Sequence, residues 1–196
     1  MMNDFLENID RSIVLAINGL NTPFLDECMW VISSKALWYP FYALLLFLAY
    51  KKLARNQFLW FVLFAVFSIV CADLISVHFF KNVFLRYRPS HNLLLEKQLH
   101  FYLKSNGELY KGGEYGFISS HAANFAALFT ISWMALKKYY PRLVWILSVI
   151  CFLVCFSRIY LGVHYLSDVF VGTLVGIGVG YLLFKAYSFI SKKQVA

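Results

Sequence analysis

The chain has 196 residues, of which 61% are hydrophobic and 14% are charged, and its mean hydropathy is +0.64. This is the composition of a polytopic membrane protein, and the length fits one domain rather than two. The formal net charge of +8 does not indicate a nucleic-acid surface, because Lys and Arg cluster in short segments between apolar runs.

The first 35 residues predict two helices at the membrane interface. Over residues 4–20, apolar side chains recur every three or four positions and polar ones occupy the other faces, the pattern of an amphipathic helix on a bilayer surface. Thr22 and Pro23 then fit the cap and the first position of a second helix. Two placements stay open for residues 24–34, on the membrane or within it, and their acidic side chains favour the first.

Five apolar runs follow, and each is near the length of about 20 residues with which a helix crosses a bilayer, except that the first is short and could extend toward the N-terminus. They predict an all-α fold, a polytopic bundle of membrane helices, in a single domain over residues 1–196 with a transmembrane core over 36–190. The polar segment 89–118 is expected to be an extracytoplasmic loop. The runs cover residues 36–50, 57–80, 119–136, 143–161 and 168–190.

The distribution of charge predicts how the chain is oriented in the membrane. Alternating spans place residues 51–56, residues 137–142 and the C-terminal tail on one side, and these segments contain Lys and Arg but no acidic residue. By the positive-inside rule this side is cytoplasmic. The other ends of the spans then meet at the opposite face, where they bring together polar side chains that are far apart in the sequence.

A cation, an imidazole and a carboxylate lie between the last two apolar runs. Ionisable groups at membrane depth cost roughly 2.5–3.5 kcal/mol at a helix centre, so they indicate function. His164 and Asp168 are four residues apart, where the carboxylate could fix the imidazole tautomer and raise its basicity. Gly162 offers a turn between His164 and Arg158. The alternative is a structural salt bridge at a corner between helices.

Three cations, Lys81, Arg86 and Arg88, end the second apolar run. Arg binds phosphate in a bidentate manner and Lys acts as a point charge, so Lys81 and Arg88 are candidate ligands of an oxyanion, together with Arg158. We interpret Arg86 as an interfacial cation whose long side chain reaches toward water. Asp73, inside the same run, either pairs with another helix or supports the site.

The third apolar run begins with Ser119, Ser120 and His121. Ser119 or Ser120 is a natural cap, and the free N–H groups at a helix N-terminus form a cradle for an anion. An imidazole beside that cradle, with an ordinary pKa of about 6.5, suits general acid catalysis. Cations, imidazoles, a carboxylate and a helix N-terminus together favour phosphoryl transfer, which depends on positioning and on charge stabilisation.

Three motifs in this order resemble the signature motifs of the type 2 phosphatidic acid phosphatase superfamily: K-x6-R-P over 81–89, Ser-x-His over 119–121 and S-R-x5-H-x3-D over 157–168. That superfamily includes bacterial lipid phosphatases and shares its site with vanadium haloperoxidases. The second motif is usually Pro-Ser-Gly-His, and Ser120 stands here where the family has Gly. The Ser-Ser-His variant resembles some bacterial members that act on lipid A.

The resemblance implies a metal-independent lipid phosphatase without a cofactor, whose partners are the bilayer and a membrane lipid and not a nucleic acid. His164 would be the nucleophile that forms a phosphohistidine, Asp168 would orient it, and His121 would be the general acid. The substrate would be undecaprenyl diphosphate, a lipid A phosphate or phosphatidylglycerol phosphate, at the outer face of the bacterial inner membrane. The implied phosphate ligands are Lys81, Arg88, Ser119, Ser120 and Arg158.

Two hypotheses from other classes stay open. A membrane protein that binds haem or a metal ion could use His121 and His164 as ligands, although three converging cations disfavour it. A lipid or anion transporter could use the same cations to bind a phosphate without hydrolysing it.

Overall fold

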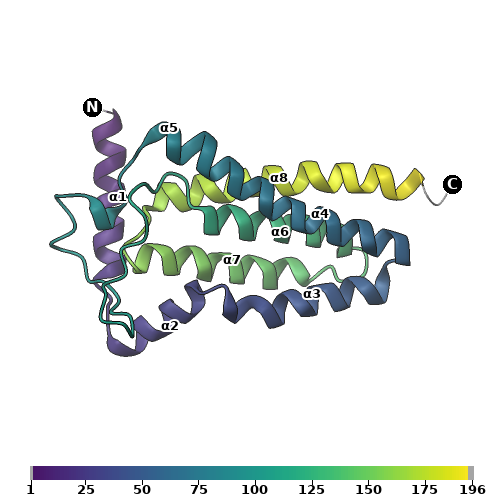
Figure 1. Ribbon diagram of the computed structural model, residues 1–196, viewed down its shortest axis with the longest axis horizontal. Coiled ribbons are helices and arrows are strands. Elements are labelled where there is room, and N and C mark those ends of the chain that lie inside the picture. Colours follow the sequence, from purple (N-terminus) through teal and green to yellow (C-terminus); the bar gives the residue numbers. More distant parts are fainter. Residues whose placement is uncertain (1, 194–196) are drawn as a thin grey trace.

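A computed structural model describes residues 2–193, and these residues form a helical bundle with a long loop over one end (Figure 1). The predicted all-α membrane bundle is confirmed. The elements are α1 (Met2–Asn18), α2 (Pro23–Ser33), η1 (Ala36–Trp38), α3 (Tyr39–Lys52), α4 (Arg55–Leu74), η2 (Ile75–Lys81), α5 (Asn82–Phe84), η3 (Pro89–His91), α6 (Ser120–Leu136), α7 (Leu143–Tyr160) and α8 (Leu166–Lys193).

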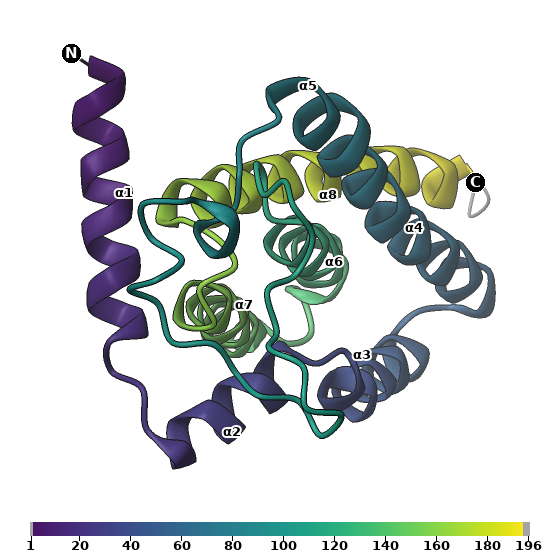
Figure 2. The same ribbon diagram turned by 60° about the vertical axis from the view of Figure 1, so that its left-hand side comes forward.

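Helix α6 is the centre of the bundle, and α4, α7 and α8 pack around it (Figure 2). Ten of its 17 residues are buried, including Phe125 and Phe129. These two rings belong to the largest hydrophobic cluster, which also contains Phe61 of α4 and Leu147 of α7. Because α6 begins directly after the long loop, the core of the bundle supports whatever is built at that end.

A stripe of glycines brings α8 against α6. A Cβ at Gly172 would lie 2.7 Å from the carbonyl oxygen of Ser119, and one at Gly176 would lie 2.2 Å from that of Ala123. The third glycine, Gly180, is equally close to α6, at 2.4 Å from a carbonyl oxygen. Small residues at every fourth position let two helix backbones approach closely in a membrane. This contact fixes the start of α8 relative to the start of α6.

Among the described residues, three helices are long and apolar enough to cross a membrane: Arg55–Phe84, Leu143–Tyr160 and Leu166–Ser191. A fourth is added if Pro23–Ser33 and Ala36–Lys52, which are bent by 66°, count as one span. Four of the five runs predicted from the sequence fall in these segments, and the fifth, 119–136, forms α6. Helix α3 has 14 residues and α6 has 17, so each is shorter than the hydrocarbon core of about 30 Å. Other helices surround α6, so its length need not match the lipid.

Helix α1 crosses the end of the bundle (Figure 2). Several of its apolar side chains are exposed. Phe5, for example, is 64% exposed. The face against the protein carries Asp10, Val14 and Asn18, four residues apart and each at most 5% exposed. The Asn18 side-chain amide donates to the carbonyl of Tyr160 at 2.7 Å. Polar contacts and the buried Val14 thus dock α1 on the bundle, while Phe5, Leu6 and Ile9 stay exposed.

Helix α2 begins as predicted, with Thr22 as the cap and Pro23 in the first turn. The Thr22 hydroxyl accepts a hydrogen bond from the Leu25 N–H at 3.2 Å. Asp26 accepts from His100 of the long loop at 2.8 Å and from the Tyr160 hydroxyl at 2.7 Å. The acidic start of α2 is therefore joined to the loop and to the end of α7.

Candidate active site

His164 and Asp168 form a buried pair where α7 turns into α8, exposed by 1% and 0%. Nδ1 of His164 lies 3.3 Å from Oδ2 of Asp168. The same carboxylate oxygen accepts the N–H of Tyr165 at 3.0 Å. Gly162, with φ of +67°, makes the predicted turn before this pair, and that backbone conformation favours glycine. The carboxylate therefore holds the imidazole in one orientation.

Arg88 determines which ring nitrogen of His164 carries the proton. Its Nη1 lies 3.2 Å from Nε2 of His164, and a guanidinium only donates hydrogen bonds. Nε2 is therefore the acceptor, and the proton on Nδ1 is donated to Asp168. The carbonyls of Tyr115 and Val163 hold the guanidinium, at 3.1 Å and 3.3 Å. The result is a neutral imidazole whose Nε2 lone pair points at a cation.

Lys81 meets the N-terminus of α6. Its ammonium donates to the Ser120 hydroxyl at 2.7 Å. Ser119 is the cap of α6, since its side chain accepts from the Ala122 N–H, and its own N–H donates to the Asp168 carbonyl at 3.0 Å. Of the two serines left open by the sequence, Ser119 thus caps the helix and Ser120 contacts the lysine. These contacts join all three motifs.

Arg158 is 3% exposed and is held by two elements outside the three motifs. It donates to the Ser33 hydroxyl at the end of α2, and at 2.9 Å to the Tyr110 hydroxyl in the long loop. The Tyr110 ring in turn packs edge-on against Trp30, with 4.9 Å between centroids. The Arg158 Nε has no hydrogen-bond partner among the described residues, so it is a buried donor suited to an anion.

His121 lies half-buried in the first turn of α6. The charges that act on its imidazole are, in order of size, those of Arg158, Lys35, Arg88 and Lys81. The sequence did not point to Lys35, because it lies at the corner between α2 and η1 and belongs to no motif. Its exposed ammonium adds a further positive charge beside His121.

The site is electropositive, and this affects both of its central side chains. Burial, followed by the charge of Arg88 and then Arg158, holds the pKa of His164 well below its usual value. Burial and the charge of Arg158 lower the pKa of Arg88 to about 10, so that its guanidinium stays protonated at neutral pH. A neutral imidazole surrounded by cations fits a site that binds an anion and attacks it.

The interpretation of Arg86 as a side chain that reaches for water is wrong. Its guanidinium forms ion pairs with Asp10 at 2.8 Å and with Asp168 at 3.1 Å, and it lies 4.2 Å above the Tyr165 ring. It also donates to the Ser167 hydroxyl at 2.7 Å. No motif pointed to this role of Arg86, because its partner Asp10 lies in a helix whose periodicity indicated only a surface position.

Asp73 pairs with another helix. Its carboxylate accepts a hydrogen bond from the Asn124 side chain of α6 at 3.3 Å. Asp73 also acts on Lys81 through its charge, so the two alternatives raised by the sequence are not exclusive.

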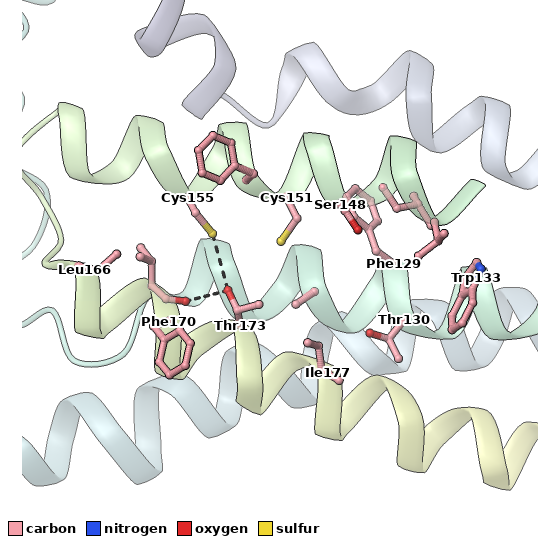
Figure 3. Close-up of a pocket in the computed structure, with 15 residues that line it drawn as sticks. Phe129, Thr130, Trp133, Ser148, Cys151, Cys155, Leu166, Phe170, Thr173 and Ile177 are labelled. Atoms are coloured by element: carbon pink, nitrogen blue, oxygen red, sulfur yellow. Dashed lines mark hydrogen bonds between the residues drawn. The ribbon is translucent and has the colours of Figure 1, made fainter. Parts of the chain in front are cut away.

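An apolar cavity of about 530 Å³ runs between α6, α7 and α8 (Figure 3). It extends from Leu166, two residues after His164, to Trp133 toward the other end of α6. Figure 3 shows Phe170 beside it and marks two polar contacts of the Thr173 hydroxyl, with Cys155 at 3.7 Å and with the Val169 carbonyl at 2.7 Å. The cavity therefore has an apolar wall, and Leu166 at one end of it follows His164 by two residues in the chain.

All eight site residues predicted from the sequence lie at the loop end of the bundle. They are Lys81, Arg88, Ser119, Ser120, His121, Arg158, His164 and Asp168. A sequence model described as PAP2 superfamily matches residues 58–192, which is most of the chain and includes all eight. The chain belongs to the PAP2 superfamily.

Two relatives extend this result to nearly the whole chain. The lipid A 4'-phosphatase of Porphyromonas gingivalis is 38% identical over 187 residues, which are 94% of this chain and 75% of that protein. The lipid A 4'-phosphatase of Bacteroides thetaiotaomicron is 31% identical over 195 residues, which are 100% of this chain and 82% of that protein. This PAP2 protein is therefore a lipid phosphatase of the membrane.

Two solved structures share the fold of this PAP2 protein. A PAP2-type phosphatidylglycerolphosphate phosphatase from Bacillus subtilis matches with a TM-score of 0.66 and 22% identity, over 93% of this chain and 86% of that one. LpxE from Aquifex aeolicus matches with a TM-score of 0.60 and 24% identity, over 89% of this chain and 93% of that one.

Proposed function

We propose that this PAP2 phosphatase removes the 4'-phosphate of lipid A through a phosphohistidine on His164. One observation carries the chemistry: Arg88 donates to Nε2 while Asp168 accepts from Nδ1, so the lone pair of Nε2 points at the guanidinium that would bind the phosphate. The two relatives of nearly full length carry the choice of lipid, since both are named lipid A 4'-phosphatases.

In the first step, Nε2 of His164 attacks the phosphorus of the bound ester. The negative charge of the bound phosphate offsets the cations around His121 and allows its imidazole to be protonated. The bond between phosphorus and the sugar oxygen breaks, and His121 gives its proton to that oxygen. Lys81, Arg88 and Arg158 balance the charge on the three equatorial oxygens, and the α6 N-terminus adds its N–H groups. The imidazole becomes cationic as it forms the N–P bond, and the Asp168 carboxylate offsets that charge.

In the second step, water replaces the imidazole. His121, now neutral, takes a proton from the water as its oxygen attacks phosphorus, and the N–P bond breaks. The electron pair returns to Nε2, and inorganic phosphate leaves. Each histidine is then in its starting state, and no step calls on a metal ion. A metal ion between the two imidazoles is also disfavoured because Arg88 already faces Nε2 of His164.

The apolar cavity supports a lipid substrate. Its volume of about 530 Å³ and its wall of apolar side chains suit an acyl chain. We place the phosphate at the buried pair and the chain along α7 and α8, with loop 89–118 over the sugar. The basic segments lie at the opposite end of the bundle, so the site would face the outside of the inner membrane. Residues 1–196 would act as one domain, with 1–35 at the interface.

Purified protein in detergent, given bisphosphorylated lipid A, should release inorganic phosphate in EDTA and should leave the 1-phosphate in place. His164→Ala should release none while keeping the thermal midpoint of the folded protein. Faster release from phosphatidylglycerol phosphate or undecaprenyl diphosphate would contradict the proposed lipid. Loss of release in EDTA, with the fold intact, would contradict the metal-free chemistry. Lipid translocation that survives in His164→Ala would identify a transporter instead.

A further inference from the structure

We propose that Asp10 of helix α1 is a positioning residue of the reaction, which acts through Arg86 on the Asp168–His164 pair. This inference rests on the proposed role of His164 and deepens it. Asp10 belongs to none of the three motifs, and it reaches the site from the other end of the sequence.

The Asp10 carboxylate is almost fully buried, with 5% exposure, and both of its oxygens are engaged. Oδ2 accepts from Arg86 at 2.8 Å and from the Ser167 hydroxyl. Oδ1 accepts from the Ser167 N–H at 3.0 Å, which is a free donor in the first turn of α8. Asp10 therefore holds both Arg86, which lies beside Asp168, and the backbone of Ser167, which precedes Asp168 in the chain.

Arg86 forms the bridge between the two carboxylates. Its Nη2 donates to Asp10, and its Nη1 donates to Oδ1 of Asp168 at 3.1 Å. The other oxygen of Asp168 is the one that faces His164. One guanidinium thus determines the rotation of the Asp168 carboxylate, and the Tyr165 ring below it restricts its plane.

Asp10 and Arg86 lie on the side of His164 that is opposite the proposed phosphate ligand Arg88. The contacts of Arg86 and Asp10 run to the Asp168 side of the imidazole, whereas Arg88 faces Nε2 on the other side. Loss of Asp10 should therefore slow the attack and leave the affinity for the phosphate nearly unchanged. The charged and titratable groups around His164 are Arg88, Arg158, Lys81 and His121, with Asp168 in direct contact.

The experiment compares Asp10→Asn, Arg86→Met and the double variant in phosphate release from lipid A. The matched control is Glu7→Gln, which removes a carboxylate from the same helix whose ion pair, within residues 2–193, is with Arg11 one turn away. Asp10→Asn should lower kcat about tenfold with KM within about twofold, by analogy with groups that orient a ligand. Arg86→Met should lower kcat further, and the double variant should lose far less than the product of the two single losses, because without Arg86 only the Ser167 contacts of Asp10 are left to lose. Glu7→Gln should behave as the wild type.

The pH profile separates positioning from a loss of folding. Removing the Arg86 charge leaves Asp168 with one cation fewer, which favours the protonated imidazole. The acidic limb of kcat/KM should therefore move to higher pH in Arg86→Met, whereas Asp10→Asn should not move it upward. Equal rates for Asp10→Asn and Glu7→Gln would overturn the inference, as would multiplicative losses in the double variant. If His164→Ala stays active, the proposed function itself fails, and the two failures are thereby distinct.

Discussion

Replacing Asp168 with Asn tests the buried pair most sharply, because the structure defines all the hydrogen bonds that the carboxylate accepts. Oδ1 accepts from Arg86, and Oδ2 accepts from His164 and from the Tyr165 N–H. An amide has one oxygen and one NH₂ group. In either orientation the NH₂ group therefore points at one of these donors, where the carboxylate would have accepted a hydrogen bond.

The magnitude follows from these contacts. An Asn in place of the carboxylate that orients a catalytic imidazole costs about 10⁴-fold in kcat, or about 5.5 kcal/mol of activation free energy. Breaking a buried ion pair costs about 3–5 kcal/mol of stability, and the lower figure applies because Arg86 keeps Asp10 as a partner. The variant should therefore lose more activation free energy than free energy of unfolding, so that folded protein remains in which the loss of activity can be measured.

The assay is phosphate release from lipid A, normalised to the folded fraction measured by thermal melting in detergent. Asp168→Asn should lose about 10³-fold to 10⁴-fold in kcat, with a small change in KM. In the background of His164→Ala, it should cause no further loss, because both residues serve one step. A loss below about tenfold in a folded protein would refute the role of the carboxylate.

Three further predictions use the close contacts and the pKa of the site. Gly116→Ala puts a Cβ 2.9 Å from Cγ of Arg88 and should lower kcat/KM by about 10²-fold, since small displacements of a binding group are costly; wild-type kinetics would contradict this. Gly176→Ala forces α8 away from α6 and should lower the free energy of unfolding by about 1–3 kcal/mol, whereas Gly178→Ala, with nothing within 4 Å of the new Cβ, should not lower it. Equal melting curves for the two variants would show that Gly176 is not packed against α6. Because the pKa of His164 lies below its unfolded value of about 6.5, the wild type should lose stability as pH falls from about 6.5 toward the lowered pKa. His164→Asn should lose less stability over the same pH range, and parallel melting profiles of the two proteins would argue against a buried neutral imidazole.

The sequence predicted the residues of the site better than the contacts that hold those residues in place. Lys81, His121 and His164 carry side chains whose cost at membrane depth already indicates function, and alternating spans place them at one face. Asp10 could not be found in this way, because a single acidic residue on an amphipathic helix is usually solvated. Only the docking of α1 in three dimensions shows that this carboxylate is buried against Arg86.

Helix α6 shows a related difference between sequence and structure. Its apolar run over 119–136 predicts a span, and the helix that forms has 17 residues and is enclosed by other helices. The stripe of Gly172, Gly176 and Gly180 was visible in the sequence as glycines four residues apart. Its partner, however, is a run of carbonyls on α6, which leaves no mark in the side-chain pattern.

Rapid quenching with lipid A labelled in the 4'-phosphate tests the central claim most directly. A covalent label should appear on the protein within one turnover, in the presence of EDTA, and it should be lost in acid and kept in alkali, as expected for a phosphoramidate. Peptide mapping should place the label on His164. Full turnover without any labelled protein, or a label on another residue, would contradict the account.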